Sequence, residues 1–387
     1  MSIFAPASPN ATHLLEWLAL SLTTGLGPTR GRKLVEHFGS PAAVFRASLT
    51  ELEGTGIQAT SAQSIATGKS AELAREEIAR AAAAEVTVLS MEDACYPPRL
   101  KEIYDPPLVL YVRGIPEVLT QPGIAMVGTR HPTPYGSGMA ERLACDLAAQ
   151  GLVIISGMAR GVDTAGHRGA ISAKGKTIAV FGTGVDVIYP KENSRLSEQI
   201  LALGGALISE FPLGTPAFPQ NFPIRNRILS GTSVGVLVVE AAEYSGTRIT
   251  ARCALEQNRD VFAVPGNVTN KNSWGPNTLI KQGAKLVATW EDVWEDLPPE
   301  VKLALTPPPS PESGGSTSAS LFPDEGLPPH EKRILSLLKA DEATHIDELV
   351  EKLENELSSS EIFAALFELE LTGKVRQMPG KNFVKSF

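Results

Sequence analysis

The sequence predicts an α/β protein built on an extended Rossmann-like parallel sheet, with a helical domain before it and a winged-helix domain after it. Between residues 106 and 297, short apolar runs rich in Val and Ile alternate with helical patterns. Most of these runs end in Gly or another small residue. Strands buried on both faces read as near-continuous apolar runs, so this alternation indicates a parallel sheet covered by helices on both sides.

Residues 1–105 are predicted to form a helical domain. Apolar residues recur at helical spacing in HLLEWLALSL, GRKLVEHF and SAELAREEIARAAAA. The segment 23–45 also contains the Gly-x-Gly turn of a helix-hairpin-helix, followed by Arg30, Arg32 and Lys33. Such a turn can hold a DNA backbone through its amides and nearby basic side chains. The alternative is a helical packing module whose charges are simply solvated.

The middle part, residues 106–297, is predicted to supply the sheet. An extended segment bracketed by prolines, DPPLVLYVRGIPEVLTQPG, leads into it from 105. The predicted strands are GIAMVG (123–128), LVIISG (152–157), TIAVFG (177–182), ALISE (206–210), VGVLVVEA (234–241), VFAVPG (261–266) and KLVATW (285–290). Patterns such as GSGMAERLACDLAAQG between them predict the covering helices.

Residues 298–326 are dense in Pro, Ser and Gly, which predicts a flexible linker. Residues 327–387 then show three helical patterns and a hairpin, which is the order of a winged helix. The third helix of that fold normally enters the major groove. Here it carries Glu361, Glu368 and Glu370 and no basic residue before Lys374, so we expect it to contact protein and not duplex DNA.

Composition narrows the class of protein. The chain has 387 residues, 43% hydrophobic and 20% charged, which excludes disorder throughout. It contains no run of about 18 apolar residues and no secretory signal pattern, so we expect no membrane span and a cytoplasmic location. Cys95, Cys145 and Cys253 lie far apart without a CxxC pair, which predicts reduced thiols and no structural zinc.

The ligand crevice of such a sheet lies beyond the carboxyl ends of its strands. Glycines gather there, and Gly128, Gly157 and Gly182 each follow a predicted strand. Because glycine lets the backbone approach a ligand closely, these turns could form a phosphate cradle. They could equally serve only to make tight turns.

No catalytic, cofactor or metal motif is convincing. GAISAKGKT (169–177) resembles a phosphate loop but has the wrong glycine spacing and leads into a strand. GTGVDV lacks the third glycine of a dinucleotide fingerprint, and neither GxSxG nor HExxH occurs. We read His167 as a helix residue near the crevice and not a catalytic base. Asp163 either caps the following helix or contacts a ligand.

The segment PAFPQNFPIRNRILSG (216–231) gives the sharpest functional signal. It places Phe222 three residues before Arg225, which begins the run Arg225-Asn226-Arg227. Bases stack on an aromatic ring while Arg holds the backbone, a combination suited to single-stranded nucleic acid. The alternative is a helix start with structural ion pairs. The net charge of −8 argues against a nucleic-acid binder, yet residues 123–232 hold ten Lys or Arg against seven Asp or Glu.

These segments resemble the DprA family of DNA-processing proteins, also called Smf. The resemblance covers nearly the whole chain and rests on seven long motifs in the same order: VGTRHPTPYG, SGMARGVDTAGHRGA, TIAVFGTGVDVIYPKEN, ISEFP, FPIRNRILSG, VVEAAEYSGTRITARCA, and VFAVPGNV with NTLIKQGA. It implies a Rossmann domain flanked by a sterile-alpha-motif-like helical domain and a winged helix. It also implies single-stranded DNA binding, protection of incoming DNA, loading of the RecA recombinase during natural transformation and recombination, homodimerisation, and no enzymatic turnover.

The resemblance also implies roles for individual residues. Gly128, Thr129 and Arg130 match a turn whose arginine contacts DNA phosphate, and Ser156 with Gly157 matches the next strand-end turn. Phe222 matches a base-stacking aromatic, and the Arg225-Asn226-Arg227 run matches the residues that hold the strand. The lysine that relatives often carry just upstream of this aromatic is absent here.

A rival prediction is a nucleotide-processing enzyme of the phosphoribohydrolase type on a similar fold. Proteins of that kind carry a PGGxGTxxE signature with a catalytic Glu and Arg. The corresponding region here reads VVEAAEYSGTRIT, so the glycine-rich loop is missing. Glu240 and Glu243 are the only candidate acids.

Overall fold

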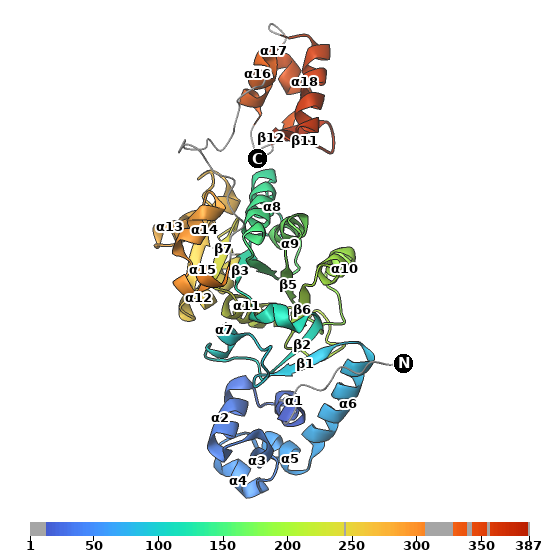
Figure 1. The fold of residues 1–387 in the computed structure, drawn as a ribbon, viewed down its shortest axis with the longest axis vertical. Helices are drawn as coiled ribbons and strands as arrows, with labels where there is room; N and C mark the ends of the chain where they lie inside the picture. The colour runs from blue at the N-terminus through green and yellow to red at the C-terminus, as the bar shows by residue number, and fades with distance from the viewer. Residues whose placement is uncertain (1–12, 244, 306–327, 339–342, 354–356, 386–387) are drawn as a thin grey trace.

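The structure is a computed structural model that describes residues 13–243, 245–305, 328–338, 343–353 and 357–385. Figure 1 shows a helical N-terminal part, a central sheet with its helices, and a separate C-terminal unit. The predicted α/β class with a mainly parallel sheet is confirmed.

The central sheet has nine strands in the order β1-β2-β6-β5-β4-β3-β7-β8-β9. Strands β3 to β9 pair in parallel, whereas β1 and β2 form an antiparallel extension next to β6. The strands are β1 (Thr87–Ser90), β2 (Val109–Gly114), β3 (Gly123–Val127), β4 (Val153–Ser156), β5 (Thr177–Val180), β6 (Ala206–Ser209), β7 (Gly235–Val238), β8 (Asp260–Ala263) and β9 (Lys285–Leu286).

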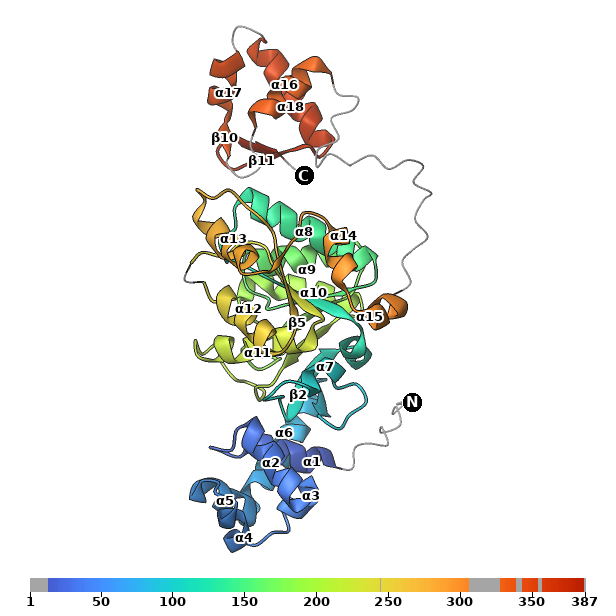
Figure 2. The same ribbon diagram turned by 90° about the vertical axis from the view of Figure 1, so that its left-hand side faces the viewer.

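Helices cover both faces of this sheet, as Figure 2 shows. On one face, α8, α9 and α14 pack on Ile124, Ile154 and Leu237; on the other, α7, α11 and α12 pack on Ala125 and Val236. These helices and their neighbours are α7 (Pro98–Lys101), α8 (Pro134–Ala149), α9 (Val162–Ser172), α10 (Ser194–Ala202), α11 (Asn221–Thr232), α12 (Thr247–Glu256), α13 (Trp274–Lys281) and α14 (Trp290–Asp296), with short 3₁₀ turns at Pro116–Thr120, Lys191–Asn193 and Lys271–Ser273.

The chain changes direction across the sheet between β3 and β7. From β3 it adds β4, β5 and β6 on one side, and it then returns to add β7, β8 and β9 on the other. The loops after β3 and β7 therefore diverge and leave a crevice at the carboxyl ends of the strands.

The N-terminal helices share a core with the sheet. Trp17 and Leu34 belong to the same buried cluster as Tyr111 and Leu207 of β2 and β6. The helices are α1 (Leu14–Leu22), α2 (Pro28–Phe38), α3 (Pro41–Val44), α4 (Leu49–Gly54), α5 (Ala59–Ala66) and α6 (Lys69–Ala83).

The sheet starts at β1, within the range 1–105 that the sequence analysis assigned to the helical domain. The sequence pattern did not predict this four-residue strand, and pairing with β2 is what makes it part of the sheet. The proline-bracketed segment likewise supplies β2, a strand of the sheet.

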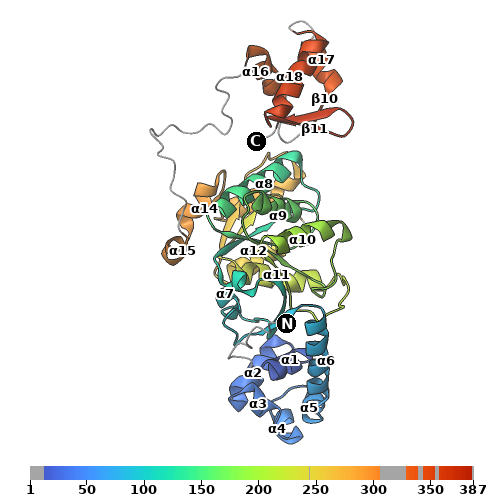
Figure 3. The same ribbon diagram turned by 45° about the vertical axis from the view of Figure 1, so that its right-hand side comes forward.

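The C-terminal unit is a winged helix with a core of its own, built around Leu349, Leu366 and Phe383. Figure 3 shows its helices α16, α17 and α18 beside the strands β10 and β11. Its elements are α16 (Pro329–Leu337), β10 (Thr344–His345), α17 (Ile346–Leu353), α18 (Ser359–Leu371), β11 (Val375–Met378) and β12 (Asn382–Lys385).

The start of the predicted linker is structured. Helix α15 (Pro299–Ala304) buries Val301, and Leu305 follows it into the core beneath α8. Burial of these two apolar side chains favours the helix, although the segment around them is rich in proline. The remainder of the predicted linker, residues 306–326, lies outside the described residues.

Candidate nucleic-acid interface

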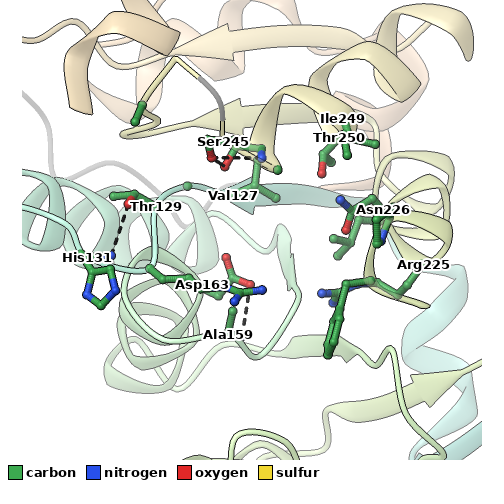
Figure 4. Close-up of a pocket in the computed structure, with 18 of the residues that line it drawn as sticks. Val127, Thr129, His131, Ala159, Asp163, Arg225, Asn226, Ser245, Ile249 and Thr250 are labelled. Carbon is green, nitrogen blue, oxygen red and sulfur yellow. Dashed lines mark hydrogen bonds between the residues drawn. The ribbon is translucent and has the colours of Figure 1, made fainter. Parts of the chain in front are cut away.

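A cavity of about 970 Å³ opens at the point where the chain changes direction across the sheet. Six segments meet there: the loops after β3, β4 and β5, the segment into α11, the segment from the end of β7 into α12, and the turn before α13. Figure 4 labels residues of the loops after β3 and β4, of α11 and of the segment into α12 around the cavity. The lining includes Gly128, Thr129, Arg130, Asp163, Tyr189, Pro219, Phe222, Arg225, Asn226, Glu243, Lys271 and Trp274.

The loop after β3 is fixed by Glu240, which follows β7 and is buried. The backbone N–H of Thr129 donates to the Glu240 carbonyl at 2.7 Å. The N–H and hydroxyl of Thr133 donate to the Glu240 carboxylate at 2.8 and 2.6 Å. The loop is therefore rigid at both ends, and it presents Arg130, which is exposed, at the edge of the cavity.

Arg130 has a free guanidinium in the described parts of the chain, since no salt bridge or hydrogen bond of its side chain is found there. A free, exposed guanidinium beside a cavity is available to an anion, and its planar fork matches a phosphate group.

Phe222 forms part of the opposite wall. Its ring packs against Gly182, where an added Cβ would lie 2.8 Å from a ring carbon, so this glycine gives the ring its place. Tyr189 lies beside it, with ring centroids 5.6 Å apart at an interplanar angle of 42°. Tyr189 is 47% exposed and Phe222 is half-buried, so the pair offers an apolar platform to a planar ligand.

Arg225 lies at the floor of the cavity and is only 5% exposed. Its guanidinium donates to the Val180 carbonyl, and its Nε has no hydrogen-bond partner among the described residues. Burial lowers the pKa of Arg225 to about 10, Asp163 opposes the shift, and the like charge of Arg130 adds to it. The group therefore remains a cation at neutral pH, and Figure 4 shows it pointing toward Asp163.

Asp163 braces the turn after β4. Its carboxylate accepts hydrogen bonds from the N–H groups of Gly157 and Ala159 at 3.1 and 3.2 Å. Burial raises the pKa of this carboxyl, while Arg225 and the hydrogen bonds counteract the shift. Of the two alternatives from the sequence, Asp163 makes no side-chain cap of α9, and it does line the cavity.

Ser156, Gly157 and Gly182 lie behind the cavity lining. The Ser156 hydroxyl donates to the Met126 carbonyl at 2.7 Å and so ties β4 to β3. A Cβ on Gly157 would lie 2.6 Å from Nη2 of Arg225, so this glycine makes room for the guanidinium. These residues support those that face the cavity.

Arg227 is placed differently from its neighbours on α11. It is 8% exposed and lies outside the lining. Its Nη atoms donate to both oxygens of Glu210 at 2.6 and 2.7 Å, and its Nε donates to the Asp105 carboxylate at 2.9 Å. Burial alone would lower the pKa of Arg227, but Glu210 and Asp105 raise it overall. The structural ion pair left open by the sequence is thus present at this residue.

His167 is fully buried in α9, where its Nδ1 lies 2.7 Å from the Thr177 hydroxyl. That hydroxyl donates its own proton to the Ile154 carbonyl. Nδ1 of His167 is therefore protonated and donates to the Thr177 hydroxyl. Burial, reinforced by Arg225, lowers the pKa of His167 to about 3. The imidazole is neutral at physiological pH and bonds within the fold.

The basic residues of the N-terminal turn lie outside the cavity lining. Arg32 pairs with Glu36 at 3.3 Å, Arg30 reaches the Gly25 carbonyl at 3.5 Å, and Lys33 is exposed. They sit together on the first turns of α2, away from any wall of the cavity.

The structure thus brings Gly128, Thr129, Arg130, Phe222, Arg225 and Asn226 to one cavity. It also adds three residues that sequence reasoning missed: Tyr189, Lys271 and Trp274. Tyr189 was visible as an aromatic in the strand-end turn GTGVDVIYP. Lys271 and Trp274 follow β8, and nothing in their sequence showed that they return to the switch point.

Glu240, a candidate acid of the rival enzyme, is held by Thr133 as described above, and Glu243 is exposed on the rim. In the described ranges, no group of three His, Cys, Asp or Glu side chains could hold a metal ion. No helix among those residues is long and apolar enough to cross a membrane.

Two family models match the chain. The model described as DNA recombination-mediator protein A matches residues 87–298, and the DprA winged helix domain matches 318–381. Protein Smf from Escherichia coli K12 is 43% identical over 286 residues, which cover 74% of each chain.

Solved structures are similar to the chain as well, among them two of DNA processing protein A. DNA processing protein A from Streptococcus pneumoniae matches with a TM-score of 0.64 and 35% identity, over 73% of this chain and 96% of that one. The Helicobacter pylori protein, reported for its unique single-stranded DNA binding mode, matches with a TM-score of 0.50 and 30% identity, over 55% and 98%.

Proposed function

Because the chain belongs to the DprA/Smf family of DNA-processing proteins, we propose that it binds single-stranded DNA in the cavity at the switch point of its sheet. The observation that carries this proposal is the combination in one cavity of a free arginine, a buried arginine and an exposed aromatic pair. A related protein is described as binding single-stranded DNA, which supports the same function here.

The arrangement suits binding without sequence preference. Arg130 and Arg225 supply positive charge to phosphate oxygens, and the Tyr189–Phe222 platform stacks a base. Every base has a flat face, so stacking and phosphate contacts discriminate little between sequences. A duplex cannot offer an unstacked base to the platform, so the single strand is preferred.

Salt dependence tests the role of Arg130. Binding of a single strand weakens with salt by a slope of about −0.7 per phosphate neutralised. Replacing Arg130 with Ala should weaken binding of a labelled dT strand at low salt and make the slope less steep by about 0.7. Arg168→Ala, an exposed arginine outside the cavity, is the control. An unchanged slope in Arg130→Ala would contradict a phosphate contact.

The basic turn of α2 provides a second, auxiliary contact in this proposal. Replacing Arg30, Arg32 and Lys33 together with Ala should lower the affinity for long single strands several-fold, because up to three cations are lost. Affinity for short strands that fill only the cavity should stay at the wild-type value. Fluorescence anisotropy with strands of two lengths measures both affinities. If the triple variant binds the long strand as tightly as the wild type does, α2 is not part of the interface.

The winged helix is proposed to contact protein. Its third helix, α18, exposes Phe363 and Phe367 beside acidic residues, and this surface would repel phosphates. Because the unit has its own core, residues 327–387 should fold alone and show no measurable binding to duplex DNA. Duplex binding by this fragment in an anisotropy titration would overturn the assignment.

We further propose that the protein acts by binding and not by turnover, protecting incoming DNA and loading the RecA recombinase as a homodimer. These proposals rest on family membership and on the absence of a catalytic motif in the sequence. Since both partners, single-stranded DNA and RecA, work in the cytoplasm, the proposal places the protein there.

A further inference from the structure

We propose that Trp274, Arg248 and Lys271 form a second nucleotide subsite in the cavity, which stacks and holds a nucleotide adjacent to the one on the Phe222 platform. The inference rests on the proposed function, because it assigns further contacts for the same strand. In this proposal the strand contacts two aromatic surfaces, the Tyr189–Phe222 platform and Trp274.

Trp274, the first residue of α13, is the main observation. It lines the cavity and is 39% exposed, although tryptophan is usually well buried in a folded protein. The exposed part of this indole is not packed in the core of the protein and is available to a ligand in the cavity. Large, rigid aromatic surfaces of this kind are typical of binding sites, and they stack bases of any sequence.

Arg248 of α12 lies over this indole, with its Cζ 5.6 Å from the ring centroid. Its Nη1 donates to the Glu243 carbonyl at 2.9 Å, so the guanidinium is held in place. Arg248 itself does not line the cavity, whereas Trp274 does. The guanidinium thus fixes the indole and adds positive charge behind it.

Lys271 supplies the cation that faces the ligand. It is exposed, lines the cavity and has no salt bridge in the described parts of the chain. Glu243 lies on the same wall and would repel a phosphate, so Lys271 is needed to make this wall attractive to a strand. Lys271 and Arg130 are thus the exposed cations of the lining.

The size of the cavity fits two subsites. At about 970 Å³ it lies at the upper end of the roughly 300–1,000 Å³ typical of ligand pockets. One stacked base on the Phe222 platform leaves much of that volume unfilled. A strand that continues from the platform across the cavity reaches the Trp274 wall.

The test combines anisotropy with tryptophan fluorescence on the full chain, using labelled dT strands of increasing length. Trp274→Ala should weaken binding of longer strands by roughly 5- to 30-fold and leave the shortest bound strand unaffected. Trp274→Phe should keep most of the affinity but lose the quenching that DNA causes in the wild type. Lys271→Ala should weaken binding and reduce the salt dependence, whereas Lys281→Ala, at the end of α13 and outside the lining, should not.

The outcomes separate the two proposals. If the wild type binds no strand, the proposed function fails and this inference falls with it. If the wild type binds and Phe222→Ala weakens binding, but Trp274→Ala binds every length like the wild type, only the second subsite is wrong. Quenching that persists in Trp274→Phe would also overturn it, because the signal would then come from Trp17, Trp290 or Trp294.

Discussion

Replacing Phe222 with Ala should lower the affinity for single-stranded DNA by about 5- to 150-fold, which corresponds to the roughly 1–3 kcal/mol that a stacked base contributes. Removing the ring takes away half of the Tyr189–Phe222 platform and leaves the space above Gly182 empty. Fluorescence anisotropy with a labelled dT strand measures the loss. Because Phe222 is only half-buried, the variant should still fold.

The chain offers a matched control four residues earlier. Phe218 lies in the same Phe-Pro-rich segment and is 47% exposed, but it does not line the cavity. Phe218→Ala should bind like the wild type, and Phe222→Tyr should keep most of the affinity. Equal losses in Phe218→Ala and Phe222→Ala would mean that the segment acts as a whole and that the platform is not the stacking site.

Replacing Arg227 with Ala should destabilise the fold by about 3 kcal/mol or more without abolishing DNA binding by the folded protein. The substitution leaves the Glu210 carboxylate, which is largely buried, without its bidentate partner. It also removes the bond to Asp105, which joins α11 to the loop before β2. Urea denaturation measures the free energy of unfolding, and anisotropy under native conditions measures the affinity.

Arg252 provides the comparison for this prediction. It forms an i,i+4 pair with Glu256 on the solvent-exposed side of α12, and such pairs contribute only about 0.3–0.5 kcal/mol. Arg252→Ala should therefore unfold almost like the wild type. If Arg227→Ala keeps the wild-type stability but loses DNA binding, Arg227 holds the strand as the sequence resemblance implied, and the ion pairs are incidental.

The fold was predictable because its strands are short, apolar and separated by helices of regular spacing. Four of the seven predicted strands form along most of their length, and VGVLVVEA and VFAVPG form along half of theirs. KLVATW forms only the two-residue β9 before α14 begins at Trp290. The antiparallel β1–β2 pair escaped recognition because TVLS is too short to stand out and β2 lies among prolines. Their place in the sheet depends on pairing across some 20 residues, which periodicity does not report.

The site was predictable in part. The switch-point rule located the crevice, and residues next to a strand end, such as Gly128 and Arg130, lie there together with Arg225 of α11. The sequence did not show which of Arg225 and Arg227 faces the cavity. Side chains two residues apart on a helix point to different sides, so only one of the two can face it. Lys271 and Trp274 reach the cavity only through the return of the chain after β8.

The central claim is that single-stranded DNA lies in this cavity, and photochemical crosslinking tests it most directly. A dT strand carrying 5-iodouracil would be bound to the wild-type chain, irradiated, and its crosslinked peptides identified by mass spectrometry. The account predicts crosslinks to peptides that contain Tyr189, Phe222 or Trp274, and their loss from the 222 peptide in Phe222→Ala. Crosslinks confined to the N-terminal helices or to the winged helix would contradict it.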